Sequence, residues 1–193
     1  MRYNRHLHLE GQHAILSASN HHWIRYTDEK MDHRFKTRLA AERGTRLHDL
    51  ANRAIRLKRF MPDDGDSFNM YVNDAIRLGL VPELTVYYSL NSYGTADAIG
   101  FSQPPLSLRW LLRIHDLKTG VAKTSVDQLY VYAALFCLEY GVKPYEIDYE
   151  FRIYQNDEIQ VYDQVDPGEV LRIMGMIVHF DKRIDRLREE SDA

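Results

Sequence analysis

Hydrophobic residues recur along the chain with two different spacings, which divide it into helical and extended stretches. The helical spacing of three or four positions covers residues 28–60, 67–78, 127–140 and 167–188. Runs rich in Val, Ile, Leu and Tyr, bounded by Gly, Pro, Asn and Ser, predict strands over residues 83–90, 92–101, 106–117 and 148–154. This order of elements fits an α/β fold. We expect the last strand to lie at the sheet edge and the last helix to cover the sheet.

Cap and turn residues set several of these boundaries. Thr45 is a plausible N-cap directly after Gly44, which predicts a break inside the long first helix. Ser67 is expected to cap the next helix and Gly79 to end it. Asn91-Ser92 separates two strand-like runs and therefore predicts the turn of a β-hairpin.

The third predicted strand ends in the sequence Asp116-Leu117-Lys118, which the turn residues Thr119-Gly120 follow. Side chains alternate across an extended backbone, so Asp116 and Lys118 leave the same face while Leu117 points the other way, into a core. A carboxylate and an ammonium placed in this way can be a plain surface ion pair. They can also be a metal ligand and a catalytic lysine.

Two other acids and a histidine help to decide between an ion pair and a metal site. Asp97 falls on the preceding strand, and neighbouring strands lie about 4.8 Å apart, so Asp97 and Asp116 would come within reach of one hard cation. His48 follows Arg43-Gly-Thr-Arg46-Leu on the inner stripe of the first helix, where a lone histidine is usually a hydrogen-bonded core residue. Glu83 is either a solvated strand end or a further ligand. The acids downstream favour the ligand interpretation of His48.

Gln128 and Tyr132 are four residues apart and therefore share one face of the helix predicted over residues 127–140. Such residues are usually unremarkable on a helix surface. Their position directly after Lys118 favours a functional interpretation.

Four short motifs, in this order, resemble the RecB-like exonuclease branch of the PD-(D/E)XK nuclease superfamily. The motifs are Gly44-Thr-Arg-Leu-His48, Gly94-Thr-Ala-Asp97, Asp116-Leu-Lys118-Thr-Gly120 and Gln128-x-x-x-Tyr132. The resemblance covers about residues 13–155. It implies a restriction-endonuclease-like core, with a central mixed β-sheet flanked by α-helices, in a single nuclease domain over residues 1–193. The chain departs from the superfamily pattern where Ala96 replaces the proline, and the second acid is Asp116 rather than Glu, which the pattern permits.

The resemblance also implies a role for each motif residue. One or two Mg²⁺ or Mn²⁺ ions would be held by His48, Asp97, Asp116, the backbone carbonyl of Leu117 and, at a position where many relatives carry an acid, Glu83. The catalytic residues would be Asp97, Asp116, Lys118, Gln128 and Tyr132. The candidate substrate-binding residues are Ser17, Ser19, Arg43, Arg46 and Tyr132.

Ser17 and Ser19 have a second interpretation. The segment Ser17-Ala-Ser19 is similar to the family's N-terminal segment, which in relatives lies close to the DNA path. Either serine can equally serve as the N-cap of a short helix that carries Trp23.

The function implied is a metal-dependent DNA exonuclease that acts in DNA recombination, repair or degradation. The stand-alone length is typical of a phage-type enzyme, which could need a homo-oligomer or a recombination partner to thread a DNA end. Two alternatives stay open: a non-catalytic DNA-binding or scaffold subunit with a nuclease fold, and a structure-specific endonuclease.

Composition narrows the class of protein further. Hydrophobic residues make up 45% and charged residues 27% of the 193-residue chain, which is ordinary for a soluble globular protein. There is no apolar run of about eighteen residues and no apolar core near the N-terminus. We therefore expect no membrane partner and a cytoplasmic protein, in a bacterial host cell if phage-encoded.

The single cysteine, Cys137, lies in an apolar stretch and is expected to be buried and inert. Some relatives in this branch carry an iron–sulfur cluster on four cysteines. One cysteine cannot ligate such a cluster by itself, so we expect none.

Charge is distributed unevenly along the chain. Residues 1–60 hold thirteen Lys and Arg against six Asp and Glu, although the whole chain carries a net charge of −3. A basic segment beside an acidic remainder is expected if one face binds a polyanion such as DNA and another binds cations. A solvated helix surface explains the basic segment equally well.

Overall fold

The computed structural model describes residues 14–120, 122 and 124–191. The chain divides into two compact units, residues 1–43 and residues 44–193. The N-terminal unit contains a short 3₁₀ helix, η2 (His21–Arg25), and the first half of α1 (Asp28–Arg56). The prediction of a single domain over residues 1–193 stays a prediction.

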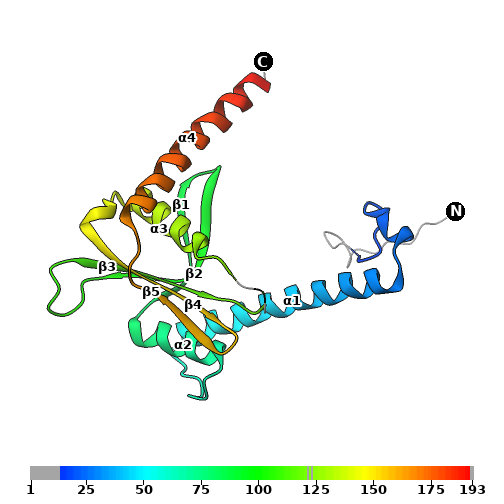
Figure 1. Ribbon diagram of the computed structural model, residues 1–193, viewed down its shortest axis with the longest axis horizontal. Helices are drawn as coiled ribbons and strands as arrows, with labels where there is room; N and C mark the ends of the chain where they lie inside the picture. Colours follow the sequence, from blue (N-terminus) through cyan, green and yellow to red (C-terminus); the bar gives the residue numbers. More distant parts are fainter. Residues whose placement is uncertain (1–13, 121, 123, 192–193) are drawn as a thin grey trace. The chain divides into compact units, whose positions relative to one another are not determined.

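A mixed sheet forms the centre of the second unit (Figure 1). In the described residues its five strands follow chain order: β1 (Val81–Ser89), β2 (Ser92–Ser102), β3 (Trp110–Leu117), β4 (Ile147–Gln155) and β5 (Glu158–Tyr162). β3 and β4 run parallel, and the other neighbouring strands are antiparallel. The helices of this unit after α1 are α2 (Ser67–Leu78), α3 (Asp127–Tyr140), the short 3₁₀ helix η3 (Pro144–Glu146) and α4 (Pro167–Ser191). The predicted α/β class, with a central mixed sheet flanked by helices, is confirmed, and it is consistent with a restriction-endonuclease-like core.

Buried hydrophobic residues cover the sheet in separate clusters. One cluster joins sheet residues such as Leu112 and Ile114 to the inner face of α3 and to Val170 of α4. Another cluster joins Leu117 and Tyr154 to α2 and to the last turns of α1. The alternation along β3 therefore sends Leu112 and Ile114 to one cluster and Leu117 to the other.

The first long helix is continuous, so the predicted break at Gly44 is wrong. Thr45 lies inside α1 rather than at an N-cap. Gly44 is buried, and a Cβ atom at this position would come within 2.9 Å of the Thr119 hydroxyl oxygen. The glycine therefore allows a close approach to the residue after Lys118, and it does not end the helix.

The last hairpin corrects another prediction. β4 is not at the sheet edge, because β5 pairs with it through a two-residue turn, Asn156–Asp157. Both turn residues have positive φ, 54° and 60°, which is the conformation of a type I′ turn. Asn and Asp tolerate this conformation, so the local sequence carried a signal for the strand that follows.

Two helix and turn boundaries also differ from expectation. Asp66, not Ser67, caps α2, because its carboxylate accepts hydrogen bonds from the first backbone amides. The β1–β2 turn is Leu90–Asn91, one residue earlier than predicted. α4 packs mainly on α3 and η3, and its Val170 belongs to the same core cluster as residues of the sheet.

None of the helices in the described part of the chain has both the length and the apolar character that a membrane span requires.

A polar network links α2 to the two central strands. Asp74 of α2 accepts hydrogen bonds from the Arg152 guanidinium and the Tyr154 hydroxyl, both at 2.8 Å. The Tyr154 hydroxyl lies 3.2 Å from Nδ1 of the buried His115, and Glu150 lies 3.1 Å from Arg152 Nε. Burial is the main cause of the lowered pKa of His115. Asp74 is thus the acid that anchors Arg152 and Tyr154 to α2.

Replacement of this acid, Asp74→Ala, is expected to lower the free energy of unfolding by about 2 kcal/mol, because it leaves charged and hydroxyl donors without their acceptor. Urea unfolding followed by circular dichroism measures the change. Asp148→Ala is the matched control, since Asp148 also pairs with an arginine, Arg109, but both side chains are about half exposed. The control should change the free energy by less than about 0.5 kcal/mol. Equal effects of the two substitutions would contradict the anchoring role.

Candidate metal centre

Three acids lie in one row across neighbouring strands. The pairs Pro82↔Ala98 and Leu84↔Ala96 set Glu83 of β1 opposite Asp97 of β2. Continuing the register of β2 and β3 by one step beyond Ala98↔His115 sets Asp97 opposite Asp116. The sheet therefore brings together acids that are separated by 14 and 19 positions in the sequence.

Regular strand pairing is interrupted along this row. The pairing of β2 with β3 stops at Ala98 and His115, and the Leu117 amide donates instead to the Asp97 carboxylate, at 2.8 Å. Glu83 has a φ of 51°, the left-handed region that a glutamate rarely adopts. Strained backbone of this kind is concentrated at functional sites.

His48 of α1 completes a group of possible metal donors. Its Nδ1 lies 3.3 Å from Oδ1 of Asp97. His48, Glu83 and Asp97 each offer one donor atom, and these atoms lie within 4.8 Å of one another. Asp116 lies outside this three-residue group, although it is next to Asp97 in the row. One imidazole and several carboxylates form a donor set that suits Mn²⁺ and Mg²⁺.

The pKa values of the site residues show that its negative charges lie close together. Burial, followed by the charge of Asp97, raises the pKa of Asp116 and also that of Glu83. The hydrogen bond to Asp97 is the largest cause of the raised pKa of His48. Each of these shifts favours the protonated form of the group, because the acids lie close together and are partly shielded from water. A divalent cation would relieve the same repulsion.

Asp116 shows the need for a cation most directly. It is 2% exposed, and Lys118 Nζ donates to its Oδ1 at 3.0 Å. Nζ also lies 2.9 Å from Oδ2, so one ammonium contacts both oxygens of the carboxylate. Burial of this carboxylate is costly even with the ammonium beside it, as its raised pKa shows, and a metal ion would stabilise its charged form. The residues present therefore fit a divalent cation.

A chain of hydrogen bonds holds Lys118. Its ammonium also donates to the Gln128 amide oxygen at 2.9 Å, and the Gln128 amide nitrogen donates to the Tyr132 hydroxyl at 2.8 Å. The Tyr132 hydroxyl in turn donates to the backbone carbonyl of Thr95 on β2, at 2.7 Å. A Cβ at Gly94 would come within 2.9 Å of the Tyr132 ring, so this close approach requires glycine. The predicted shared face of Gln128 and Tyr132 is confirmed.

A residue that the sequence analysis missed supports the segment after Lys118. Gln155, buried at the end of β4, donates from its amide nitrogen to the backbone carbonyls of Gly120 and Ala122. Its amide oxygen accepts from the Thr124 hydroxyl at 2.8 Å. The only sequence signal was a polar residue at the end of an apolar strand, which strand periodicity does not distinguish from an ordinary strand end.

The predicted substrate-binding residues are distributed over both units. Ser17 and Ser19 belong to the N-terminal unit, where they line a cavity of about 450 Å³ with Arg34 and Arg38 of α1. η2 follows Asn20 and has no side-chain cap, so neither serine caps it as expected. The Ser17 hydroxyl accepts instead from the Asn20 amide, at 3.3 Å.

Arg43 ends the N-terminal unit and Arg46 follows in the second unit, both as exposed residues of α1.

The ligand role of the Leu117 carbonyl stays a prediction. Burial raises the pKa of the Cys137 thiol to about 11, in keeping with the inert cysteine expected.

No family model, curated protein or solved structure matches this chain. The resemblance to the RecB-like nucleases therefore rests on the four sequence motifs alone and stays a prediction.

Binding of Mn²⁺ is expected to weaken about tenfold when the pH falls from about 8 to about 6. Metal ligands must be deprotonated, and the raised pKa values of His48, Glu83 and Asp116 mean that protons compete at higher pH than for ordinary groups. Isothermal titration calorimetry of the metal-free protein measures this change.

His48→Gln is the control for this titration. It removes the group with the highest ordinary pKa of the three, so the pH dependence should become shallower and move to lower pH. Binding that is independent of pH in the unsubstituted protein would contradict the assignment of these residues as ligands.

Proposed function

We propose that this protein is a metal-dependent nuclease that hydrolyses phosphodiester bonds of DNA, and that it acts as an exonuclease. One observation carries the proposal: Asp116 is buried beside Lys118, in a row with the acids Asp97 and Glu83. An acid in this state gains most from a cation, and the adjacent ammonium is suited to a phosphate substrate.

In this proposal His48, Glu83, Asp97, Asp116 and the Leu117 carbonyl hold one or two Mg²⁺ or Mn²⁺ ions. Such ions supply Lewis acidity, which activates a water as nucleophile and stabilises charge on the scissile phosphate. Oxygen donors suit Mg²⁺, while the imidazole of His48 makes Mn²⁺ competent as well. The Leu117 amide keeps the Asp97 carboxylate in place through its hydrogen bond.

Lys118 is the residue proposed to act on the reacting groups. Its ammonium would orient the attacking water or neutralise the negative charge that develops on the phosphate. Gln128 fixes the position of the ammonium, and Tyr132 fixes Gln128 against the carbonyl of Thr95. An arginine would be a poor replacement, because a planar guanidinium does not offer the same compact charge.

DNA is the proposed partner because the basic residues concentrate before residue 60. Ser17, Ser19, Arg43 and Arg46 would contact the phosphate backbone, and the cavity that Arg34 and Arg38 line supports this role for the serines. The biological setting would be DNA recombination, repair or degradation in a bacterial cytoplasm, with a recombination protein as a further partner.

The alternative of a non-catalytic scaffold is less well supported. A binding surface has no need for a buried acid next to other acids, because such a group destabilises the fold. A structure-specific endonuclease would use the same chemistry, and the difference lies in how DNA enters.

Degradation assays can separate these possibilities. End-labelled linear DNA should be lost in the presence of Mg²⁺ or Mn²⁺, while closed circular DNA persists and EDTA stops the reaction. Asp116→Ala should lower the rate by at least about 1,000-fold, because it removes a ligand and the partner of Lys118. Asp163→Ala, at an exposed acid before α4, is the control and should retain the full rate.

Each other outcome has a definite meaning. Cleavage of circular DNA would support the endonuclease. Binding of DNA without cleavage of either form, with either metal, would contradict catalysis and support the scaffold.

Tyr132→Phe is expected to lower kcat about tenfold while Mn²⁺ affinity stays unchanged, because the substitution frees Gln128 and Lys118 without touching a ligand. Single-turnover kinetics and calorimetry measure the two quantities. Tyr140→Phe is the control, since Tyr140 is exposed at the far end of α3. An equal loss of metal binding in Tyr132→Phe would contradict a role that acts through Lys118.

A further inference from the structure

The C-terminal half of α4 extends beyond the helix it packs on (Figure 1). Val170 is buried, and Ile173 and Ile177 pack partly against the core. Within the described chain, all residues of α4 after Phe180 except Asp181 are exposed. Helices in proteins gain most of their stability from packing of an apolar face, so a partner that packs on this half of α4 would stabilise it.

An apolar stripe continues along this projecting half. Phe180, Ile184 and Leu187 are 52%, 38% and 47% exposed. Together with Ile173 and Ile177 they follow the alternating spacing of four and three residues that defines the seam of a coiled coil. The stripe begins with residues that pack against the core and continues without interruption into the exposed half of α4.

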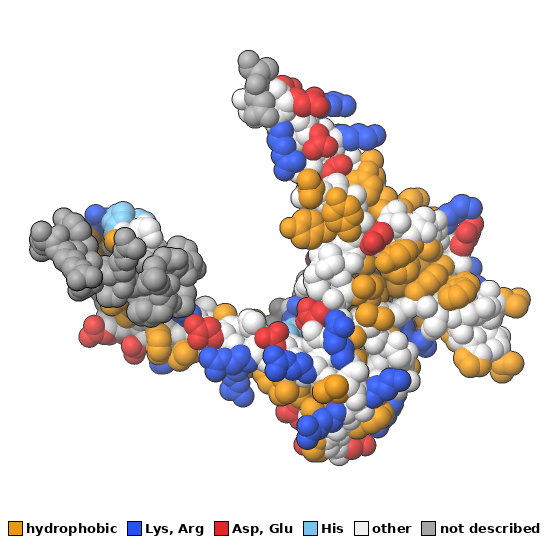
Figure 2. Space-filling model, turned by 180° about the vertical axis from the view of Figure 1, so that it is seen from behind, with side chains coloured by type: hydrophobic (Ala, Val, Ile, Leu, Met, Phe, Trp, Pro, Cys, Tyr) orange, Lys and Arg blue, Asp and Glu red, His pale blue; other side chains and the backbone are white. Residues whose placement is uncertain are grey.

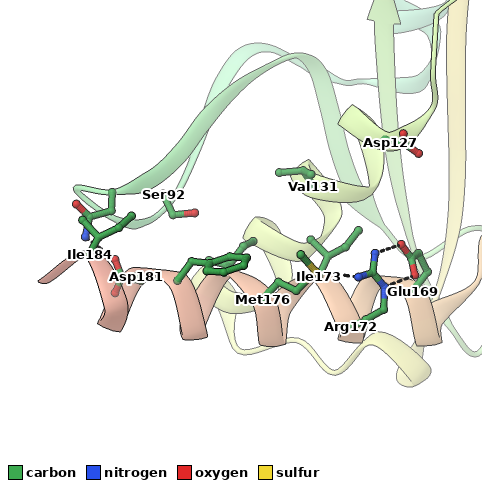
Figure 3. A pocket seen from close by; sticks show the side chains of 12 residues that line it. Ser92, Asp127, Val131, Glu169, Arg172, Ile173, Met176, Asp181 and Ile184 are labelled. Carbon is green, nitrogen blue, oxygen red and sulfur yellow. Dashed lines mark hydrogen bonds and ion pairs between the residues drawn. The ribbon is translucent and has the colours of Figure 1, made fainter. Parts of the chain in front are cut away.

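The stripe from Ile173 to Ile184 forms one wall of a groove of about 530 Å³, and Leu187 lies beyond it. Figure 3 shows Ile173, Met176 and Ile184 of α4 along this groove, with Val131 of α3 opposite and Ser92 of the β1–β2 hairpin at one end. The α4 wall of the groove thus combines the apolar stripe with Glu169, Arg172 and Asp181, and it extends into the projecting half of the helix.

The hairpin tip fixes the direction of α4. The Asn91 amide donates to Asp181 and to Asp185, both at 2.9 Å, and the Ser89 hydroxyl donates to Asp181. Leu90 at the tip is 81% exposed beside these contacts. The projecting half is therefore anchored on one flank, while the apolar stripe stays open.

Charged residues flank the stripe in a pattern that is complementary to itself. One flank carries Asp181 and, seven residues later, Arg188; the other carries Arg183 and, seven residues later, Glu190. Figure 2 shows side chains of both charges alternating toward the end of α4. Each flank thus reverses its sign over one heptad.

This reversal favours one orientation of two identical helices. When they run antiparallel with Ile184 facing Leu187 of the second copy, Asp181 faces Arg188 and Arg183 faces Glu190, each twice by symmetry. When they run parallel, the residues that meet across the seam are Arg183 and Arg188, which repel. The charges therefore select the antiparallel pair.

We propose that the projecting half of α4 binds the same segment of a second copy of this chain, antiparallel, in a two-fold symmetric dimer. Phe180, Ile184 and Leu187 form its apolar centre. The overlapping segments cover less than the roughly 800 Å² per partner of a stable interface, so the dimer is reversible, with a Kd on the order of 10 μM. The proposal is independent of the nuclease function.

Sedimentation velocity from about 1 to about 200 μM tests the dimer. The unsubstituted protein should shift from monomer to dimer over this range. Arg183→Glu should raise the Kd at least about tenfold, because it places glutamate against Glu190 of the second copy twice. The double variant Arg183→Glu with Glu190→Arg should restore the original Kd, since it exchanges the two signs.

Lys182→Glu is the matched control, with the same change of charge on the side of α4 away from the stripe, and it should leave the Kd unchanged. Circular dichroism verifies that each variant keeps its helix content. Tighter association of Arg183→Glu would indicate the parallel pair and overturn the proposal. A monomer at all concentrations, or a double variant that does not recover, would overturn it as well.

Discussion

The candidate metal centre depends on one hydrogen bond, in which the Leu117 amide donates to the Asp97 carboxylate. At this point the side chain takes the place of a backbone acceptor on β2, where the pairing with β3 has already ended. The bond fixes the Asp97 carboxylate next to the strand end that carries Asp116 and Lys118. The geometry of the site is thus a property of the sheet itself, and rigid strands hold functional side chains more precisely than loops do.

The same arrangement lowers the stability of the fold, so the surrounding structure must hold it in place. Glu83 has a strained backbone, Asp116 is buried with a raised pKa, and His48 shares a small space with Asp97. Such features persist only where the surrounding structure determines them. Apolar clusters on the sheet and the network around Asp74 supply that support. A cation at the centre would offset part of the cost by neutralising the acids.

Local periodicity determined a large part of the fold and the composition of the site. The helices over residues 67–78 and 127–140 follow from apolar spacing and turn residues, and the structure has helices there, although Asp66 and not Ser67 caps the first. Alternation along a strand placed Asp116 and Lys118 together, and helical spacing joined Gln128 to Tyr132. These relations span at most four residues. Backbone geometry alone fixes them, so the sequence by itself is sufficient.

Tertiary structure decided the relations that span longer distances. The approach of His48 to Glu83 and Asp97, and the support of Gly120 by Gln155, depend on which elements pack together. The close approach of Thr119 to Gly44 inside α1 likewise depends on packing, which no local propensity predicts. A helical glycine and a strand-end glutamine have the same local pattern wherever they occur. Their roles arise from neighbours far away in the sequence, and only the packed fold determines those neighbours.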